Sequence, residues 1–140
     1  EMCAIDVRDH SLRRVDSTPF PMDMDLLRPV VTAPCRRMKL KLGEECLVYS
    51  YQVRTMDTDL NHHMNNTNYI RLILDAQPSS FWDRYRVQEF DVHYVNESVE
   101  GEEIQVYCQT EAQEMAVQIK RGETTLVKAL LQLAQREKSE

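Results

Sequence analysis

Residues 57–77 read DTDLNHHMNNTNYIRLILDAQ, a polar stretch that runs directly into an apolar one. The apolar part, residues 69–77, predicts a helix because its large apolar residues recur at i, i+3, i+4 and i+7, which puts them on one face. Ile70 and Leu74 widen that face, so we expect the helix to be buried on more than one side. Pro78 would end it. The residues of the main stripe are Tyr69, Leu72, Ile73 and Ala76.

Patterns typical of β-strands occur in the sequence both before and after this predicted helix. Before it, residues 46–53 alternate in polarity, as in a strand with one buried face. After it come four more strands, separated by turns at residues 100–102 and 121–123. The last strand, residues 126–134, carries apolar residues on both of its faces and should therefore lie inside the sheet. The alternating residues are Leu47, Tyr49, Tyr51 and Val53, then Phe90, Val92 and Tyr94, then Ile104, Val106 and Cys108, then Met115, Val117 and Ile119.

The order of these elements predicts an α+β fold. One strand, one helix and four strands in a meander fit a single antiparallel sheet wrapped around one long buried helix. The chain has 140 residues, of which 42% are hydrophobic, enough for one domain with a core of its own.

Composition excludes several classes of partner. A net charge of −6 argues against nucleic acid. No apolar run approaches the ~18 residues that cross a bilayer, so we expect no membrane insertion, and the polar first residues do not resemble a signal peptide. The four cysteines form no CxxC pair, which favours a reduced, cytoplasmic setting. The first residue is Glu1 rather than Met, which suggests a processed chain or a fragment.

The N-terminal third differs from the rest of the chain. Residues 3–15 predict a short hairpin, and residues 19–34, with four of the five prolines, predict a linker. Residues 26–43 carry five basic residues and no acid. They are either a solvated linker or a docking surface for an acidic partner. The basic residues are Arg28, Arg36, Arg37, Lys39 and Lys41.

The polar stretch before the helix allows several interpretations. Asn65, Asn66 or Thr67 can cap the helix, but capping does not explain the polar residues upstream. The spacing Asp57-x-Asp59-x-Asn61 imitates the start of an EF-hand loop, yet the glycine and glutamate which that loop requires are missing. A transition metal is also a weak interpretation, because the adjacent His62 and His63 do not naturally converge on one ion. We therefore expect no metal and no cofactor.

Hydrolysis fits this stretch better. Thioester cleavage needs an activated water or nucleophile, and donors for the oxyanion that forms. The start of a buried helix offers free N–H groups, and His63 can move a proton near neutral pH. Asp59 or a distant carboxylate can orient that histidine, while Asn61 can hold the water or the oxyanion.

At this point the sequence resembles a family. Asp59-x-Asn61-x-His63-x-Asn65-Asn66-x-x-Tyr69-Ile70 resembles the D-x-N-x-H-x-N-N-x-x-Y-I signature of acyl-ACP thioesterases, the plant-type enzymes and their bacterial relatives. Residues 94–98, YVNES, resemble the family's later Y-x-x-E-C strand end. Residues 3–15 resemble the strand pair that closes the family's first hot-dog repeat.

The resemblance implies a fold, a reaction and a set of residues. It implies a hot-dog fold that releases free fatty acid from acyl carrier protein. It also implies a catalytic set, in which Glu97 activates water or pairs with His63 to do so. Asn61 and His63 would position the water and stabilise the tetrahedral intermediate. Asp59 would orient the other three. Substrate would contact the loop, the helix and the basic segment, at Asn65, Asn66, Tyr69, Arg36 and Arg37.

Two departures from the family matter. Ser98 stands where many members have a cysteine once assigned as nucleophile, which favours attack by water. Members also carry two hot-dog repeats. We therefore expect residues 1–18 to end a first repeat, 19–43 to form the basic linker and 44–140 to form the second repeat. The partner would be a first repeat in a pseudo-dimer, or a second copy.

Three functional hypotheses follow. The first is an acyl-ACP hydrolase of the bacterial cytoplasm or plastid stroma, the second an acyl-CoA thioesterase, and the third a non-catalytic acyl-binding or dimerisation half of a larger enzyme. A hot-dog dehydratase would place a histidine on the buried helix, and residues 67–77 contain none.

Overall fold

A computed structural model describes residues 4–5, 12–13 and 38–136. The chain divides into two units, Glu1–Pro34 and Cys35–Glu140. In the first unit, β1 (Ala4–Ile5) pairs antiparallel with β2 (Leu12–Arg13), as the hairpin prediction requires. The predicted turn between these strands, the proline-rich stretch and Arg28, Arg36 and Arg37 lie outside the described residues.

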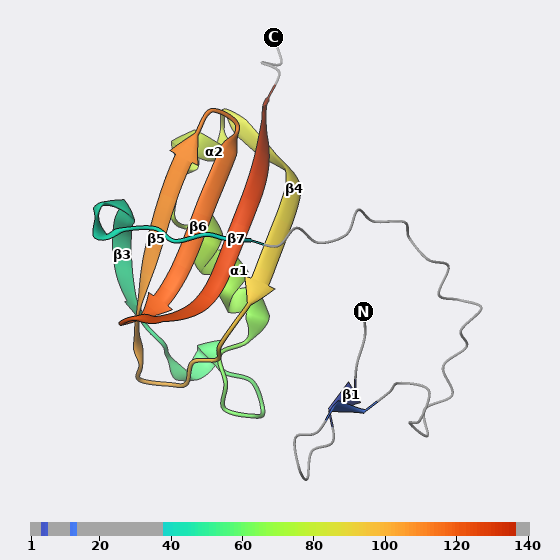
Figure 1. The fold of residues 1–140 in the computed structure, drawn as a ribbon, viewed down its shortest axis with the longest axis vertical. Coiled ribbons are helices and arrows are strands. Elements are labelled where there is room, and N and C mark those ends of the chain that lie inside the picture. Colours follow the sequence, from blue (N-terminus) through green and yellow to red (C-terminus); the bar gives the residue numbers. More distant parts are fainter. Residues whose placement is uncertain (1–3, 6–11, 14–37, 137–140) are drawn as a thin grey trace, which may run out of the picture. The chain divides into compact units, whose positions relative to one another are not determined.

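The second unit is a five-stranded antiparallel sheet packed around one helix (Figure 1). The strands are β3 (Leu47–Gln52), β4 (Tyr85–Tyr94), β5 (Glu103–Glu111), β6 (Glu114–Arg121) and β7 (Thr124–Gln135). The helices are α1 (Asn66–Leu74) and the one-turn α2 (Ser79–Trp82). Two short 3-10 helices, η3 (Glu44–Cys46) and η4 (Thr55–Asp57), flank β3. The predicted sheet and the helix start near Asn66 are thus confirmed.

The strand order corrects one expectation. The sheet runs β3-β5-β6-β7-β4, so β5, β6 and β7 form a meander, but β4 pairs with β7 and not with β5. The prediction of a four-strand meander was therefore wrong. Because β4 lies at the opposite side of the sheet from β5, the connection between them, residues 95–102, must cross one end of the sheet. As predicted, β7 is an interior strand, with β6 on one side and β4 on the other.

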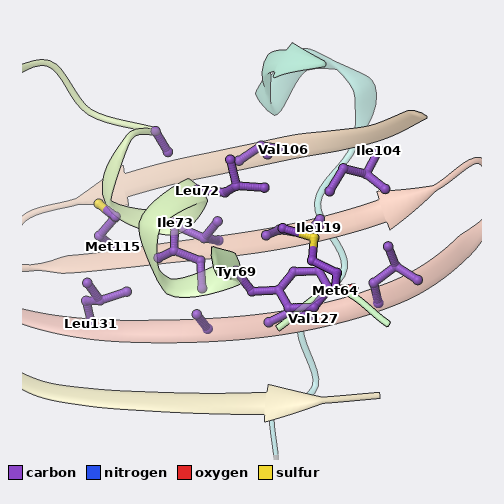
Figure 2. Packing of buried hydrophobic residues seen from close by; sticks show 14 of the residues in the cluster. Met64, Tyr69, Leu72, Ile73, Ile104, Val106, Met115, Ile119, Val127 and Leu131 are labelled. Atoms are coloured by element: carbon purple, nitrogen blue, oxygen red, sulfur yellow. The ribbon is translucent and has the colours of Figure 1, made fainter. Parts of the chain in front are cut away.

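The core lies between α1 and the sheet (Figure 2). Tyr69, Leu72 and Ile73 of α1 are at most 2% exposed. The inward residues of the interior strands are equally buried except Cys108 of β5, which is half-buried, so the alternation is confirmed apart from that position. On the edge strand β3, a bulge between Leu47 and Tyr49 breaks the alternation and leaves Leu47 exposed, against expectation. The strand residues that meet the helix include Val106, Met115, Ile119, Val127 and Leu131.

The buried helix is shorter than the sequence predicts. It ends at Leu74, three residues before Gln77. The phenol of Tyr49 donates to the carbonyl of Leu72 at 2.7 Å, and the indole N–H of Trp82 donates to the carbonyl of Leu74 at 3.1 Å. In a longer helix the Ala76 amide would bond the Leu72 carbonyl, and the Tyr49 phenol takes that place here. No i+4 amide exists for the Leu74 carbonyl, because residue 78 is proline, and Trp82 supplies a donor instead. Beyond Leu74 the chain continues in tight turns, in which Ala76 is still buried.

The face of the sheet opposite α1 is crossed by the segment that precedes η3 (Figure 1). Leu42 is 4% exposed there. Its amide donates to Gln118 Oε1 at 2.8 Å, and its carbonyl accepts from Lys120 Nζ at 2.7 Å. The segment that the sequence assigned to the end of a linker is therefore bound along β6.

Candidate active site

The polar loop between β3 and α1 is closed at its base by Asp57. The carboxylate, 5% exposed, accepts hydrogen bonds from the Tyr51 phenol (2.7 Å), the Arg54 amide (2.9 Å) and the Arg71 guanidinium (3.0 Å). Its backbone carbonyl accepts from the amide of Asn65, at the other end of the loop, at 2.8 Å. Burial of this carboxylate is tolerated because each oxygen has a partner. The loop thus begins and ends at one fixed point.

The tip of the loop, which carries Asp59, Asn61 and His63, is a tight turn. The Asp59 amide donates to the His63 carbonyl at 2.8 Å, and His62 takes a positive φ of 62°. Asp59 Oδ1 accepts from the amides of Asn61 (2.8 Å) and His63 (3.3 Å). The Asp59 carboxylate therefore holds the turn itself, as Asp side chains often do. His62 is exposed, whereas Met64 is buried below the turn.

The connection between β4 and β5 brings Glu97 to this loop. The Met64 amide donates to the Ser98 carbonyl at 2.8 Å, and His63 and Val99 form an isolated antiparallel bridge. Across this contact, His63 Nδ1 lies 3.1 Å from Glu97 Oε2. Strand β4 ends at Tyr94, and the crossing connection carries Glu97 to this position.

A pocket of about 710 Å³ opens where the loop, the start of α1 and this connection meet. All four residues predicted to be catalytic line it, together with Asn65, Asn66 and Tyr69. Sequence reasoning assigned no role to its other lining residues. Three of them directly precede Glu97 in the sequence, and this adjacency to a predicted catalytic residue could have identified them as pocket residues. The additional residues are Met64, Tyr94, Val95 and Asn96.

Residues at the start of α1 line the pocket. Asn65 is the N-cap, and its side-chain oxygen accepts from the Thr67 amide at 2.9 Å. The Asn68 amide donates to the Asn65 carbonyl at 2.9 Å. Among the described residues the amide of Asn66 has no such partner, and Asn66 lines the pocket. The side-chain amide of Asn61 is likewise without a hydrogen-bond partner in the described part of the chain. Both groups can therefore donate a hydrogen bond to a ligand.

Ser98 points away from the pocket. Its side chain is 0% exposed, and its hydroxyl bonds the Tyr69 phenol at 2.6 Å and contacts Met64 Sδ at 3.6 Å. Burial raises the pKa of Tyr69, although its hydrogen bonds with Ser98 act in the opposite direction. The phenol therefore stays protonated at neutral pH and offers Ser98 no base.

Two further findings concern ligands and membranes. Within residues 38–136 and the β1–β2 pair, no three His, Cys, Asp or Glu side chains gather into a group that could hold a metal ion. No helix in the same part of the chain is long and apolar enough to span a membrane.

Solved structures establish the class of fold. The acyl-ACP thioesterase from Bacteroides thetaiotaomicron matches with a TM-score of 0.68 and 22% identity, over 93% of this chain and 53% of that one. The 12:0-ACP thioesterase from Umbellularia californica matches with a TM-score of 0.71 and 16% identity, over 94% and 53%. A thioesterase from Thermus thermophilus, complexed with coenzyme A and Zn, matches with a TM-score of 0.57 and 19% identity, over 66% and 80%. The fold is therefore the hot-dog fold of thioesterases.

The family follows from the sequence profile. The acyl-ACP thioesterase C-terminal domain matches residues 40–133. This chain belongs to that family. It spans about half the length of the two acyl-ACP thioesterases above, at 53% of each. No curated protein matches it in sequence.

Proposed function

We propose that this protein hydrolyses the thioester of an acyl carrier protein and releases a free fatty acid. The contact between His63 Nδ1 and Glu97 Oε2, 3.1 Å at the pocket, carries the proposal. Family membership supports it as well, since residues 40–133 match the acyl-ACP thioesterase domain. A histidine held by a carboxylate is a common general base near neutral pH.

In the proposed reaction, water is the nucleophile. Glu97 fixes the imidazole through Nδ1, and Nε2 of His63 takes a proton from the water as its oxygen attacks the thioester carbon. The tetrahedral oxyanion accepts hydrogen bonds from the Asn66 amide and the Asn61 side chain. The carbon–sulfur bond then breaks, the carrier thiol leaves with a proton from His63, and a fatty acid remains. Asp59 acts indirectly, because its carboxylate holds the turn on which Asn61 and His63 stand.

The acyl chain would lie against the apolar part of the pocket. Tyr69 and Tyr94 have ring centroids 6.2 Å apart, and Val95 continues this wall. The Tyr94 phenol donates to the Asn66 carbonyl at 3.3 Å, which ties the wall to the start of α1. Asn65 and Asn66 would contact the polar end of the substrate.

Hydrolysis of acyl-ACP by the full protein tests these roles. We expect Glu97→Gln and His63→Ala each to lower kcat by roughly 10²–10⁴-fold while the protein stays folded. Ser98→Ala is the matched control, because Ser98 is adjacent to Glu97 but faces the core. We expect it to keep kcat within a few fold. Loss of turnover in Ser98→Ala with normal turnover in Glu97→Gln would establish a serine nucleophile instead.

The carrier is tested separately. We propose that the basic segment containing Arg36 and Arg37 helps the acidic carrier protein approach. The KM for acyl-ACP should then rise with ionic strength and with the pair Arg36→Glu and Arg37→Glu, because opposite charges steer association and salt screens them. The same variants assayed with acyl-CoA provide the control. A salt-independent KM, unchanged by the double reversal, would return the segment to the role of linker.

The alternative is an acyl-CoA thioesterase, which the similarity to a thioesterase solved with coenzyme A supports. A higher kcat/KM for acyl-CoA than for acyl-ACP would favour it. We further propose that this domain pairs with another hot-dog unit, either a first repeat or a second copy. The proposed compartment is the bacterial cytoplasm or the plastid stroma, where acyl-ACP would be met.

A further inference from the structure

An ion pair from outside the signature motif holds the connection that carries Glu97. Arg121 is the last residue of β6, and Glu102 directly precedes β5. Because these strands are neighbours in the sheet, Arg121 lies beside Glu102, which is the last residue of the crossing connection. Arg121 Nη1 lies 2.6 Å and 2.7 Å from the two carboxylate oxygens of Glu102. Both side chains are partly shielded from solvent, at 38% and 27% exposed, so water screens the pair less than a fully exposed one.

Both members of this pair also bond the backbone next to Glu97. Arg121 Nη1 donates to the carbonyl of Glu97 at 3.4 Å. Glu102 Oε2 accepts from the amide of Val99 at 3.0 Å. The pair therefore contacts the chain at residue 97 and again two residues later. Three consecutive residues, Glu97–Val99, are bracketed by a charged clamp that extends from β6.

The backbone at Glu97 must be held in place because few contacts restrain the Glu97 side chain. The Glu97 side chain is 73% exposed, and its one ion-pair partner in the described part of the chain is His63. An exposed glutamate samples several rotamers, so its backbone must be fixed if its carboxylate is to meet His63 reproducibly. The clamp fixes the backbone at Glu97 through residues at the end of β6 and just before β5.

We propose that Arg121 and Glu102 are positioning residues for the proposed base pair of Glu97 and His63. They act through the backbone of the connection and touch no reacting atom, and this role rests on the proposed function. Glu102 also occupies the Arg121 guanidinium, which would otherwise be free to attract the Glu97 carboxylate away from His63.

The ionisation of Glu102 supports the arrangement. Partial burial raises the pKa of Glu102, but the hydrogen bonds from Arg121 and Val99 and the charge of Arg121 outweigh this, and the pKa lies below its usual value. The Glu102 carboxylate is thus charged at neutral pH. A charge-assisted bond of this kind is about twice as strong as a neutral one.

Steady-state kinetics of the full protein on acyl-ACP test the proposal. We expect Arg121→Met and Glu102→Gln each to lower kcat by up to about 10²-fold, the usual cost of misplacing a reacting group by ~1 Å, with KM within about twofold. Arg121→Lys, which keeps the charge, should recover most of kcat. The double variant should be no slower than the slower single variant, since the two residues act as one unit.

A matched control is Arg136→Met. Arg136 also donates to a backbone carbonyl, from Nε to Tyr85 at 3.2 Å, but at the opposite end of β4 from the pocket. It should leave kcat unchanged. Unchanged kcat in Arg121→Met and Glu102→Gln would overturn the proposal. So would a kcat loss of equal size in Arg136→Met, or an equal loss in Arg121→Lys and Arg121→Met.

Glu97→Gln, assayed in parallel, separates this inference from the proposed function. If Glu97→Gln abolishes turnover and Arg121→Met does not change it, the positioning role fails and the proposed function stands. If Glu97→Gln itself turns over normally, the proposed mechanism fails, and the positioning role fails with it. Should Arg121→Met not fold, Glu102→Gln decides alone, because its amide oxygen still accepts from Val99 and only the charge is lost.

Discussion

At the scale of single residues, neighbouring positions 97 and 98 have opposite surroundings. Glu97 reaches His63 at the pocket, while Ser98 is fully buried and bonds Tyr69 and Met64. A small polar residue fits position 98 because the buried Tyr69 phenol requires a partner.

We therefore expect Ser98→Ala to affect stability rather than chemistry. It should lower the free energy of unfolding by about 1–3 kcal/mol, because it leaves the buried Tyr69 hydroxyl unpaired. Chemical denaturation of the wild type, Ser98→Ala, Tyr69→Phe and the double variant gives the coupling energy between the two hydroxyls. Strictly additive losses would mean that the 2.6 Å contact contributes nothing.

At the scale of elements, α1 owes its position to groups at its ends. The Asn65 side chain caps its first turn, and Tyr49 and Trp82 satisfy carbonyls of its last turn. Nine residues are too few for a stable isolated helix, so packing and caps must hold it. The N-terminal cap also fixes the edge of the pocket, since Asn65 and Asn66 line it.

Removing that cap should be measurable. Asn65→Ala is expected to lower the free energy of unfolding by about 1 kcal/mol, because the Thr67 amide loses its acceptor. Asn65→Asp keeps an acceptor and should remain close to the wild type. Asn66→Ala, one residue along on the exposed start of α1, is the matched control. Thermal denaturation with equal losses in Asn65→Ala and Asn65→Asp would contradict the capping role.

At the scale of the whole molecule, the folded unit begins before η3. Leu42 packs on the face of the sheet opposite α1, and Gln118 and Lys120 bond its backbone. The Tyr107 phenol donates to the carboxylate of Glu44, the first residue of η3, at 3.0 Å. The family match, which starts at residue 40, agrees with this extent.

Leu42→Ala should consequently destabilise the domain. We expect a loss of at least about 2 kcal/mol in the free energy of unfolding, the lower end for truncating a buried leucine. Lys41→Ala, at the adjacent exposed position, should change it by less than about 0.5 kcal/mol. Urea denaturation compares the two. Similar, small effects for both would mean that residues before 44 do not belong to the folded unit.

The sequence by itself determined the local features. The apolar stripe gave the buried face of α1, the alternation gave the inward face of each interior strand, and the cap residues gave the helix start near Asn66. The polar motif identified six of the residues that line the pocket, namely Asp59, Asn61, His63, Asn65, Asn66 and Tyr69. These features could be predicted because the period of apolar residues along one segment reports which side that segment buries.

Only the tertiary structure decided which segments meet. Periodicity gives the face of a strand but not its neighbour, so the pairing of β4 with β7 could not be read from it. That pairing sends residues 95–102 across the end of the sheet, and the crossing brings Glu97 to His63 and the Arg121–Glu102 pair below the connection. The early end of α1 likewise depends on the Tyr49 phenol, which reaches the Leu72 carbonyl from β3. The order of residues in one segment carries no record of such contacts between residues distant in the chain.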